Sequence, residues 1–133
     1  MTSLESYREF VGVNMQLTEH FALADFICPC CDTVKVIPAL YRHVALLERL
    51  RNELGREIIV ISGYRCPRHN AAVGGAARSW HLLFATDVTI EPFDLETLEE
   101  LARLAEAAGF GGIGRYDRHI HLDLRPEPSR WRA

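Results

Sequence analysis

Two short segments of this chain concentrate side chains that bind metal ions. The first runs from Ser79 through His81 to Asp87, and the second is His119-Ile120-His121-Leu122-Asp123. Two imidazoles and one carboxylate form the three-ligand set that catalytic zinc uses, with a fourth position left for water. The residue types therefore predict a zinc site that can activate water.

The spacing of these residues matters more than their number, because side chains alternate between the two faces of an extended strand. One face is expected to carry Ala85, Asp87 and Thr89, and the opposite, core face to carry Thr86, Val88 and Ile90. The same rule places His119, His121 and Asp123 together on a second strand. If the two strands are neighbours in one sheet, Asp87 and His121 converge on one ion, which His81 reaches from the preceding turn. The alternative interpretation is a set of ordinary surface residues on half-buried strands.

Two amphipathic helices are expected to support these strands. The first is predicted over 38–54, with Pro38 in its first turn and Gly55 directly after it as a stop. The second is predicted to begin after Asp94, a suitable N-cap, and to end at Gly109. The side chains at helical spacing that should face the core are Leu40, Val44, Leu47, Leu50 and Leu54, followed by Leu95, Leu98, Leu101, Ala105 and Ala108.

The remaining segments predict short strands and turns. The β-branched run at 57–61 predicts a strand that is covered on both faces and central in the sheet. Residues 1–35 form an irregular lead-in with an extended piece at 17–21. The small-residue segment 71–77, which follows 62–70, is expected to form a short helix that ends in a glycine turn. Helices mixed with short strands, without a strict strand–helix–strand cycle, indicate an α+β domain with a small antiparallel sheet and flanking helices.

Length and composition limit the broad class. A chain of 133 residues, 48% apolar and 25% charged, is expected to form a single domain over 1–133. Residues 1–16, the first part of the lead-in, and a C-terminal tail at 126–133 are expected to lie outside its body. The net charge of −3, with basic residues clustered only near the C-terminus, disfavours nucleic acid as a partner. No apolar run approaches the roughly 20 residues that span a bilayer, and the N-terminus lacks the order of a secretory signal. We therefore expect a monomer made as a soluble cytoplasmic protein.

Three of the four cysteines lie together in Cys28-Pro29-Cys30-Cys31, and the fourth is Cys66. This crowding is compatible with inert or structural thiols, with a disulfide to Cys66, or with a small structural metal site at Cys28, Cys30 and Cys31. A catalytic thiol is the weakest option, because water at a zinc site already supplies a nucleophile.

Together these motifs resemble the zinc D-alanyl-D-alanine carboxypeptidase and L-alanyl-D-glutamate endopeptidase group of cell-wall peptidases, which shares its fold with the hedgehog signalling domain. The resemblance extends over 17–125. The motifs that carry it are, in chain order, Ser62-Gly63-Tyr64-Arg65, His69-Asn70, Val73-Gly74-Gly75-Ala76, Ser79-x-His81, Ala85-x-Asp87, Gly112-Ile113-Gly114 and His121-x-Asp123. Each motif alone is weak, whereas their joint order is specific.

The resemblance implies a hedgehog/DD-peptidase-like fold and zinc-dependent hydrolysis of a peptidoglycan stem peptide by bound water. It implies that His81, Asp87 and His121 hold the zinc. It also implies that Arg65 and Ser79 contact the substrate.

The general base is expected at His119. Many members of this group carry an acidic residue three positions before the last histidine ligand, where this chain has Arg118. A related branch has the form His-x-His, which His119-Ile120-His121 matches, and an imidazole suits proton transfer near neutral pH. Asp117 is the second candidate for this role, and Asp123 is expected to orient a ligand histidine.

One departure from the family pattern lies between two expected ligands. The usual Ser-x-His-x-x-Gly-x-Ala-x-Asp is one residue shorter here and lacks its glycine, since His81 is followed by Leu82-Leu83-Phe84-Ala85-Thr86-Asp87. A slip of register would turn Asp87 into the core, so we expect the shortening to lie next to His81. Two rival classes stay open: a catalytically degenerate metal- or cell-wall-binding module, and a phage structural component with the same fold. Action at the cell wall would require release through a lytic pore, or a longer gene start.

Overall fold

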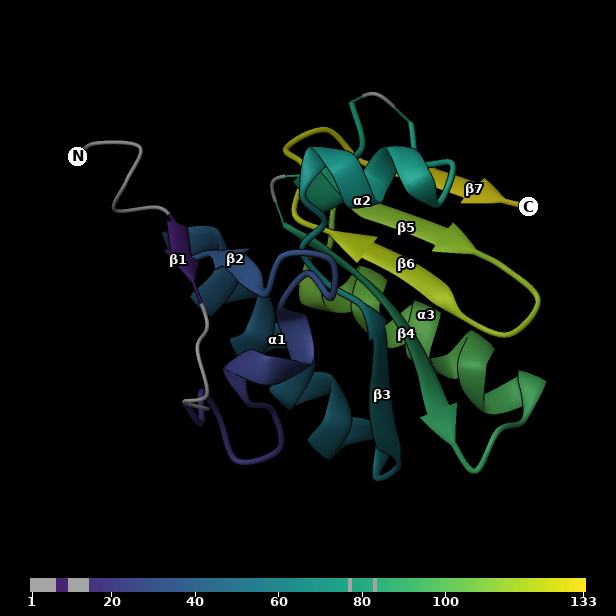
Figure 1. The fold of residues 1–133 in the computed structure, drawn as a ribbon. Coiled ribbons are helices and arrows are strands. Elements are labelled where there is room, and N and C mark those ends of the chain that lie inside the picture. The colour runs from purple at the N-terminus through teal and green to yellow at the C-terminus, as the bar shows by residue number, and fades with distance from the viewer. Residues whose placement is uncertain (1–6, 10–14, 77, 83) are drawn as a thin grey trace.

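The computed structural model describes residues 7–9, 15–76, 78–82 and 84–133. Its strands form a two-stranded sheet, β1-β2, and a five-stranded sheet in the order β3-β4-β6-β5-β7 (Figure 1). Neighbouring strands of the larger sheet are antiparallel, except that β5 and β7 run parallel. In chain order the elements are β1 (Tyr7–Glu9), a 3-10 turn (Leu23–Phe26), β2 (Thr33–Lys35), α1 (Pro38–Leu54), β3 (Glu57–Ser62), α2 (Pro67–Ala72), a 3-10 turn (Trp80–Leu82), β4 (Ala85–Glu91), α3 (Leu95–Ala108), β5 (Gly112–Arg115), β6 (Ile120–Asp123) and β7 (Ser129–Arg132).

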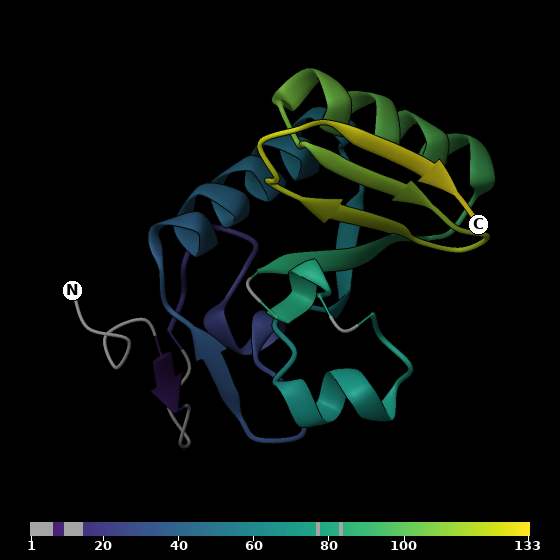
Figure 2. The ribbon, with the colours of Figure 1, turned by 90° about the horizontal axis from the view of Figure 1, so that it is seen from above.

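The helices lie on opposite sides of the sheet. Helices α1 and α3 contact each other and cover one face, whereas the short α2 lies on the other side (Figure 2). The core fills the space between the sheet and the two long helices. Its buried members include Leu40, Val44, Leu47, Val88, Ile90, Leu98, Leu101, Ile113, Ile120 and Leu122. The opposite face of the sheet is thereby left for polar side chains. This arrangement confirms the predicted α+β domain.

Both long helices begin and end as predicted. Gly55 ends α1 in the left-handed conformation, with φ of 68°, which a residue without a Cβ adopts at little cost. At the start of α3, Asp94 Oδ1 accepts a hydrogen bond of 2.7 Å from the Thr97 amide. Leu95 was expected to face the core but is 59% exposed. It lies in the first turn, at the margin of the buried stripe, and therefore does not reach the sheet.

The strand predicted at 57–61 is present as β3, but its predicted central position is wrong. β3 is an edge strand, and Ile59 and Ile61 are 37% and 57% exposed. A short β-branched run suits any strand surface, so the pattern alone does not separate an edge strand from a central one. The pairing of β3 with β4 is also irregular between Val60 and Ser62, which places Ser62 opposite Asp87. Such a bulge re-aims side chains near a functional site.

The lead-in packs closely against the segment that follows β3. Residues 17–21 are not extended as predicted, because the amides of Leu17 and Thr18 both donate to the Phe21 carbonyl and close a bend. The Tyr64 amide donates to the Phe26 carbonyl at 2.9 Å. A Cβ at Gly63 would lie 2.7 Å from the Phe26 backbone, so only glycine allows this approach.

Residues 126–133, expected as a tail, contain β7 and belong to the sheet. β7 pairs with β5 in parallel, with Gly114 opposite Trp131. Among the described residues, no helix combines the length and hydrophobicity needed to cross a membrane.

Candidate metal centre and catalytic cleft

His81, Asp87 and His121 converge at one point on the polar side of the sheet. β4 and β6 are neighbours, and their register places Asp87 directly opposite His121. His81 comes from the 3-10 turn that precedes β4. Asp87 Oδ1 lies 3.3 Å from His81 Nε2 and 3.3 Å from His121 Nδ1. The three donor atoms all lie within 4.8 Å of one another, as the alternation of the two strands predicts.

Hydrogen bonds determine which nitrogen each histidine offers. His81 Nδ1 lies 2.8 Å from the Gly63 carbonyl, which only accepts, so Nδ1 carries the proton and Nε2 has a free lone pair. His81 Nε2 is buried without a hydrogen-bond partner. In the same way, His121 Nε2 lies 2.6 Å from Asp123 Oδ2, which leaves Nδ1 directed at Asp87. An unpaired buried nitrogen is costly, so this arrangement suits a metal ion.

The charges of the cluster also suit a cation. Burial by itself raises the pKa of Asp87, but interactions with His121 and His81 outweigh it and hold the pKa well below its usual range. Burial likewise lowers the pKa of His121, while hydrogen bonds with Asp123 and Asp87 outweigh it and raise the pKa. Asp87 is therefore a carboxylate at neutral pH, and a metal ion at His121 Nδ1 would compete with a proton for that nitrogen. The donors present, two imidazoles and one carboxylate, fit zinc with one position left open.

Asp123 holds the His121 ring in place through the hydrogen bond to Nε2. Its carboxylate is fully buried and accepts hydrogen bonds from the Arg125 amide at 3.0 Å, Nε at 2.8 Å and Nη2 at 2.6 Å. Burial raises the pKa of Asp123, but the Arg125 and His121 hydrogen bonds outweigh it and keep the pKa below its usual range. A Cβ at Gly112 would lie 2.3 Å from this carboxylate, so glycine is needed beside it. This geometry agrees with the predicted orienting role.

A cleft of about 690 Å³ opens over the three convergent side chains. Its walls include Trp80, Tyr116 and Trp131. A Cβ at Gly114 would lie 2.3 Å from the Trp131 ring, so glycine allows this ring to pack against the strand. Trp131 Nε1 donates a hydrogen bond to Tyr116 Oη at 3.0 Å. Sequence reasoning missed Trp131 because it lies in the segment taken for a tail. The alternation in Ser-Arg-Trp-Arg was the available signal for a strand there.

Arg65 and Ser79 both line the cleft, and both also support the convergent residues. Arg65 Nη2 donates to Asp87 Oδ2 at 3.3 Å, and Nη1 donates to Asn70 Oδ1 at 3.2 Å. Ser79 Oγ accepts from the His81 amide at 3.2 Å and holds the 3-10 turn. Arg65 therefore makes an ionic contact with Asp87 at the edge of the cleft.

The two candidates for the general base are placed differently. His119 lines the cleft, although it precedes β6 instead of belonging to it. Its ring stacks on Tyr116, with 4.5 Å between centroids and 7° between planes. Asp117 is exposed and is not among the residues that line this cleft. The structure thus places His119 in the cleft wall and leaves Asp117 outside it.

The shortened segment between His81 and Asp87 includes Leu83, which lies outside the described residues. On either side of it the geometry is regular, with Ala85 opposite Asp123 and Asp87 opposite His121. Phe84 is buried in the core, where its ring meets His43 edge-on at 4.8 Å between centroids. The register of β4 is therefore preserved despite the missing residue.

The family model described as Peptidase M15 matches residues 19–123, which includes every member of the convergent cluster. No curated protein matches the chain.

Proposed function

This chain belongs to the Peptidase M15 family, and we propose that it is a zinc-dependent peptidase that hydrolyses peptidoglycan-type peptides. Peptidases of this family depend on zinc and act on peptidoglycan peptides. One observation carries the proposal. His81, Asp87 and His121 each direct one donor atom to a common point in the cleft, while hydrogen bonds to Gly63 and Asp123 occupy the other ring nitrogens.

We assign the metal ligands by atom. His81 binds through Nε2, His121 through Nδ1 and Asp87 through Oδ1. When bound there, zinc lowers the pKa of water and polarises a carbonyl oxygen. Gly63 and Asp123 hold the two imidazole rings in place, which limits the ligand set to one geometry. Because Arg65 binds the second oxygen of Asp87, the carboxylate offers one oxygen to the metal.

His119 is the proposed acid–base group. It accepts a proton from the attacking water and returns it to the amine that leaves. The stacked Tyr116 ring restrains the imidazole plane, and Trp131 holds the Tyr116 hydroxyl. The proton-transfer group is thus part of the cleft wall that runs from β6 to β7.

Arg65 and Ser79 are the proposed substrate contacts. Both line the cleft beside the metal centre, and a guanidinium binds a peptide carboxylate strongly. Arg65 also sits on Asp87, so binding of a carboxylate at Arg65 places the adjacent peptide bond next to the ligands. This position suits either removal of a terminal D-alanine or cleavage within the stem peptide.

One feature supports a second candidate, a catalytically degenerate metal- or cell-wall-binding module. The segment between His81 and Asp87 is one residue shorter than the pattern of the peptidases that the chain resembles. A module of this kind would keep the metal ligands and the fold without turnover. The two candidates differ only in catalysis, because both require the metal.

Metal exchange followed by a peptide assay tests the proposal. The protein is freed of metal with a chelator, loaded with zinc, and incubated with purified stem peptides, and the products are identified by mass spectrometry. Loss of a single terminal residue indicates a carboxypeptidase, and two internal fragments indicate an endopeptidase. Zinc-dependent cleavage supports the peptidase. Full zinc loading with no cleavage of stem peptides or intact cell-wall material overturns it in favour of the binding module.

A further inference from the structure

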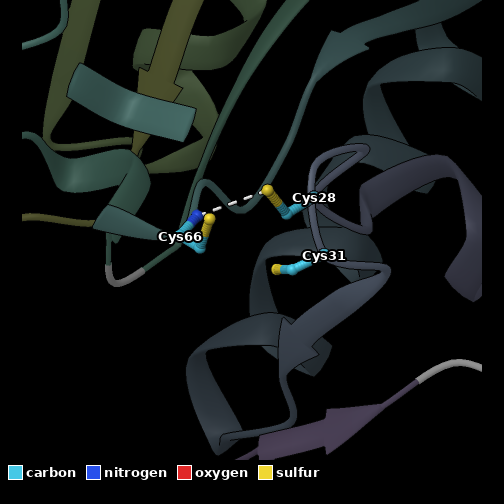
Figure 3. Close-up of side chains that lie close together, drawn as sticks. All are labelled: Cys28, Cys31 and Cys66. Atoms are coloured by element: carbon cyan, nitrogen blue, oxygen red, sulfur yellow. Dashed lines mark hydrogen bonds between the residues drawn. The ribbon is translucent and has the colours of Figure 1, made fainter. Parts of the chain in front are cut away.

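Three of the four cysteines of the chain converge at one place outside the cleft. Cys28 and Cys31 come from the loop before β2, and Cys66 comes from the segment that leads into α2 (Figure 3). The sulfur atoms of these three lie within 4.8 Å of one another, and all four thiols are free. The fourth, Cys30, directly precedes Cys31 in the same loop and is exposed. We call these four residues the cysteine cluster.

A tight turn presents Cys28 and Cys31 on the same side of the loop. The Cys28 amide donates to the Thr33 carbonyl at 2.7 Å, and the Asp32 amide donates to the Cys28 carbonyl at 2.8 Å. Asp32 takes a left-handed backbone conformation, with φ of 53°, which asparagine and aspartate tolerate better than most residues. Two residues separate the two cysteines, and this spacing is common among structural zinc ligands.

Hydrogen bonds reach three of the four sulfurs. The Cys66 amide donates to Cys28 Sγ at 3.4 Å, and the His69 amide donates to Cys66 Sγ at 3.4 Å. Cys31 Sγ lies 2.8 Å from Thr33 Oγ1. Donors of this kind stabilise thiolate, which is the form that binds metal.

We propose that Cys28, Cys30, Cys31 and Cys66 bind a structural zinc ion, separate from the ion in the cleft. Four thiolates around zinc at about 2.3 Å would lie about 3.8 Å apart, so the three sulfurs that already lie within 4.8 Å need only a small movement. Each thiol that binds releases its proton to solvent. A full set of thiolates leaves no open position, which is the mark of a structural site and not of a catalytic one.

A disulfide explains the cluster less well. It would join two sulfurs and leave the others without a role, whereas three sulfurs converge and each has its own hydrogen-bond partner. The hydrogen bonds that backbone amides donate to Cys28 Sγ and Cys66 Sγ also suit a negatively charged thiolate, and a disulfide has no charged sulfur. The geometry therefore favours metal over oxidation.

This zinc would fasten the lead-in to the segment that builds the cleft. Cys66 directly follows Arg65 and is the N-cap of α2. In α2, Asn70 accepts from Arg65 and donates to the Ala76 carbonyl, and Ala76 lines the cleft. On the other side, Cys28 lies two residues after Phe26, whose carbonyl accepts from Tyr64. The cysteine cluster thus links the loop before β2 to the start of α2, and these two segments hold Gly63 and Arg65 in position.

Elemental analysis of four proteins tests this proposal without any activity assay. The wild type, purified under reducing conditions without added metal, should carry about two zinc ions per chain. His121→Ala and Cys66→Ser should each carry about one, and the double variant should carry almost none. His121→Ala is the matched counterpart of Cys66→Ser, because each removes one ligand from one cluster. Equal zinc in Cys66→Ser and in the wild type would overturn the proposal.

Cobalt substitution keeps the test decisive if Cys66→Ser fails to fold. Co²⁺ bound to thiolates gives charge-transfer absorption in the near ultraviolet, which a site of imidazoles and a carboxylate does not give. His121→Ala loaded with cobalt should show this absorption, and its absence would overturn the proposal.

Alkylation of the unfolded wild type without reductant gives a further check. Four modified cysteines support a metal site, whereas two unmodified ones show a disulfide and refute it. A protein with two zinc ions but no hydrolysis would refute the proposed function and leave this inference intact.

Discussion

The histidine–aspartate cluster and the cysteine cluster are built on different kinds of backbone. His121 and Asp87 face each other across paired strands, so the register of the sheet sets their separation. The cysteines lie in a tight loop and at the start of a short helix, where hydrogen bonds and a single left-handed residue hold them. A sheet is rigid before any ligand arrives, whereas a loop gains rigidity from the ion that it binds.

The surroundings of the two clusters differ as well. The first lies under a cleft and has three donors, which leaves room for water and substrate. The second has four thiols and contributes its sulfurs to packing between the lead-in and α2. If both clusters bind zinc as proposed, the catalytic ion and the ion that stabilises the cleft walls are held by separate parts of the chain. Variants of each cluster should therefore differ in which property they lose.

The largest effect is expected for His121→Ala. Two remaining ligands rarely hold zinc tightly, so this variant should lose the cleft metal and fall to background hydrolysis. It should keep its fold and the metal of the cysteine cluster, because β6 retains its strand pairing. Circular dichroism, elemental analysis and a stem-peptide assay measure these three outcomes. Retention of zinc at the wild-type level would contradict the ligand assignment.

His119→Ala should have the next largest effect, a loss of about 10²- to 10⁴-fold in kcat with zinc content unchanged. The reason is that His119 lines the cleft but is not one of the convergent ligands. Asp117→Ala is the matched comparison, since Asp117 is close in sequence and lies outside the cleft wall. Steady-state kinetics with both variants decide between the two residues. A larger loss in Asp117→Ala would move the proton-transfer role to that residue.

Asp123→Asn should weaken zinc binding in the cleft by about 10- to 100-fold, as is usual for a carboxylate that orients a ligand histidine. The asparagine keeps the shape but no longer provides the charge opposite His121 and Arg125. Competition with a chromogenic chelator measures the affinity. Thiolate absorption from cobalt at the cysteine cluster should not change, and a parallel loss there would show that the variant acts through the whole fold.

The same variant predicts a pH dependence in the metal-free protein. The pKa of Asp123 is lower in the folded chain than in the unfolded chain, where it is about 3.9. Its contribution to the free energy of unfolding is therefore fully present above about pH 4 and is lost as the pH falls through the lower, folded value. Urea denaturation of wild type and Asp123→Asn should show a difference at pH 7 that shrinks below pH 4. A difference that stays constant down to pH 3 would contradict this.

The smallest effect is expected for Trp131→Phe. Phenylalanine keeps most of the packing against Gly114 but cannot donate to Tyr116 Oη. A neutral hydrogen bond contributes about 0.5–1.5 kcal/mol, which corresponds to a change of several-fold in kcat/KM if Tyr116 positions His119. Kinetics of Trp131→Phe and Tyr116→Phe provide the comparison, because each removes one partner of the same bond. Unequal losses of kcat/KM in the two variants would show that the hydrogen bond between Trp131 and Tyr116 does not account for the effect.

Sequence reasoning succeeded where the pattern is local. Alternation placed Asp87 on the polar face of β4 and Val88 on the core face. Pro38, Asp94 and the two terminal glycines placed the ends of α1 and α3. It failed where the answer depends on a partner far along the chain. The exposed edge position of β3 and the pairing of β7 with β5 are both of this kind. A strand pattern describes two faces but does not name the neighbouring strand.

The residue types and spacing in this chain determined by themselves the candidate metal-ligand set, the α+β class and the family resemblance. Those properties depend on side-chain chemistry and on backbone periodicity, which a sequence contains in full. Only the tertiary structure decided that Cys66 joins Cys28 and Cys31, that His119 faces the cleft while Asp117 does not, and that Trp131 forms a wall. Each of these depends on contacts between segments distant in the chain, and such contacts form only when the core packs and the strands take their register.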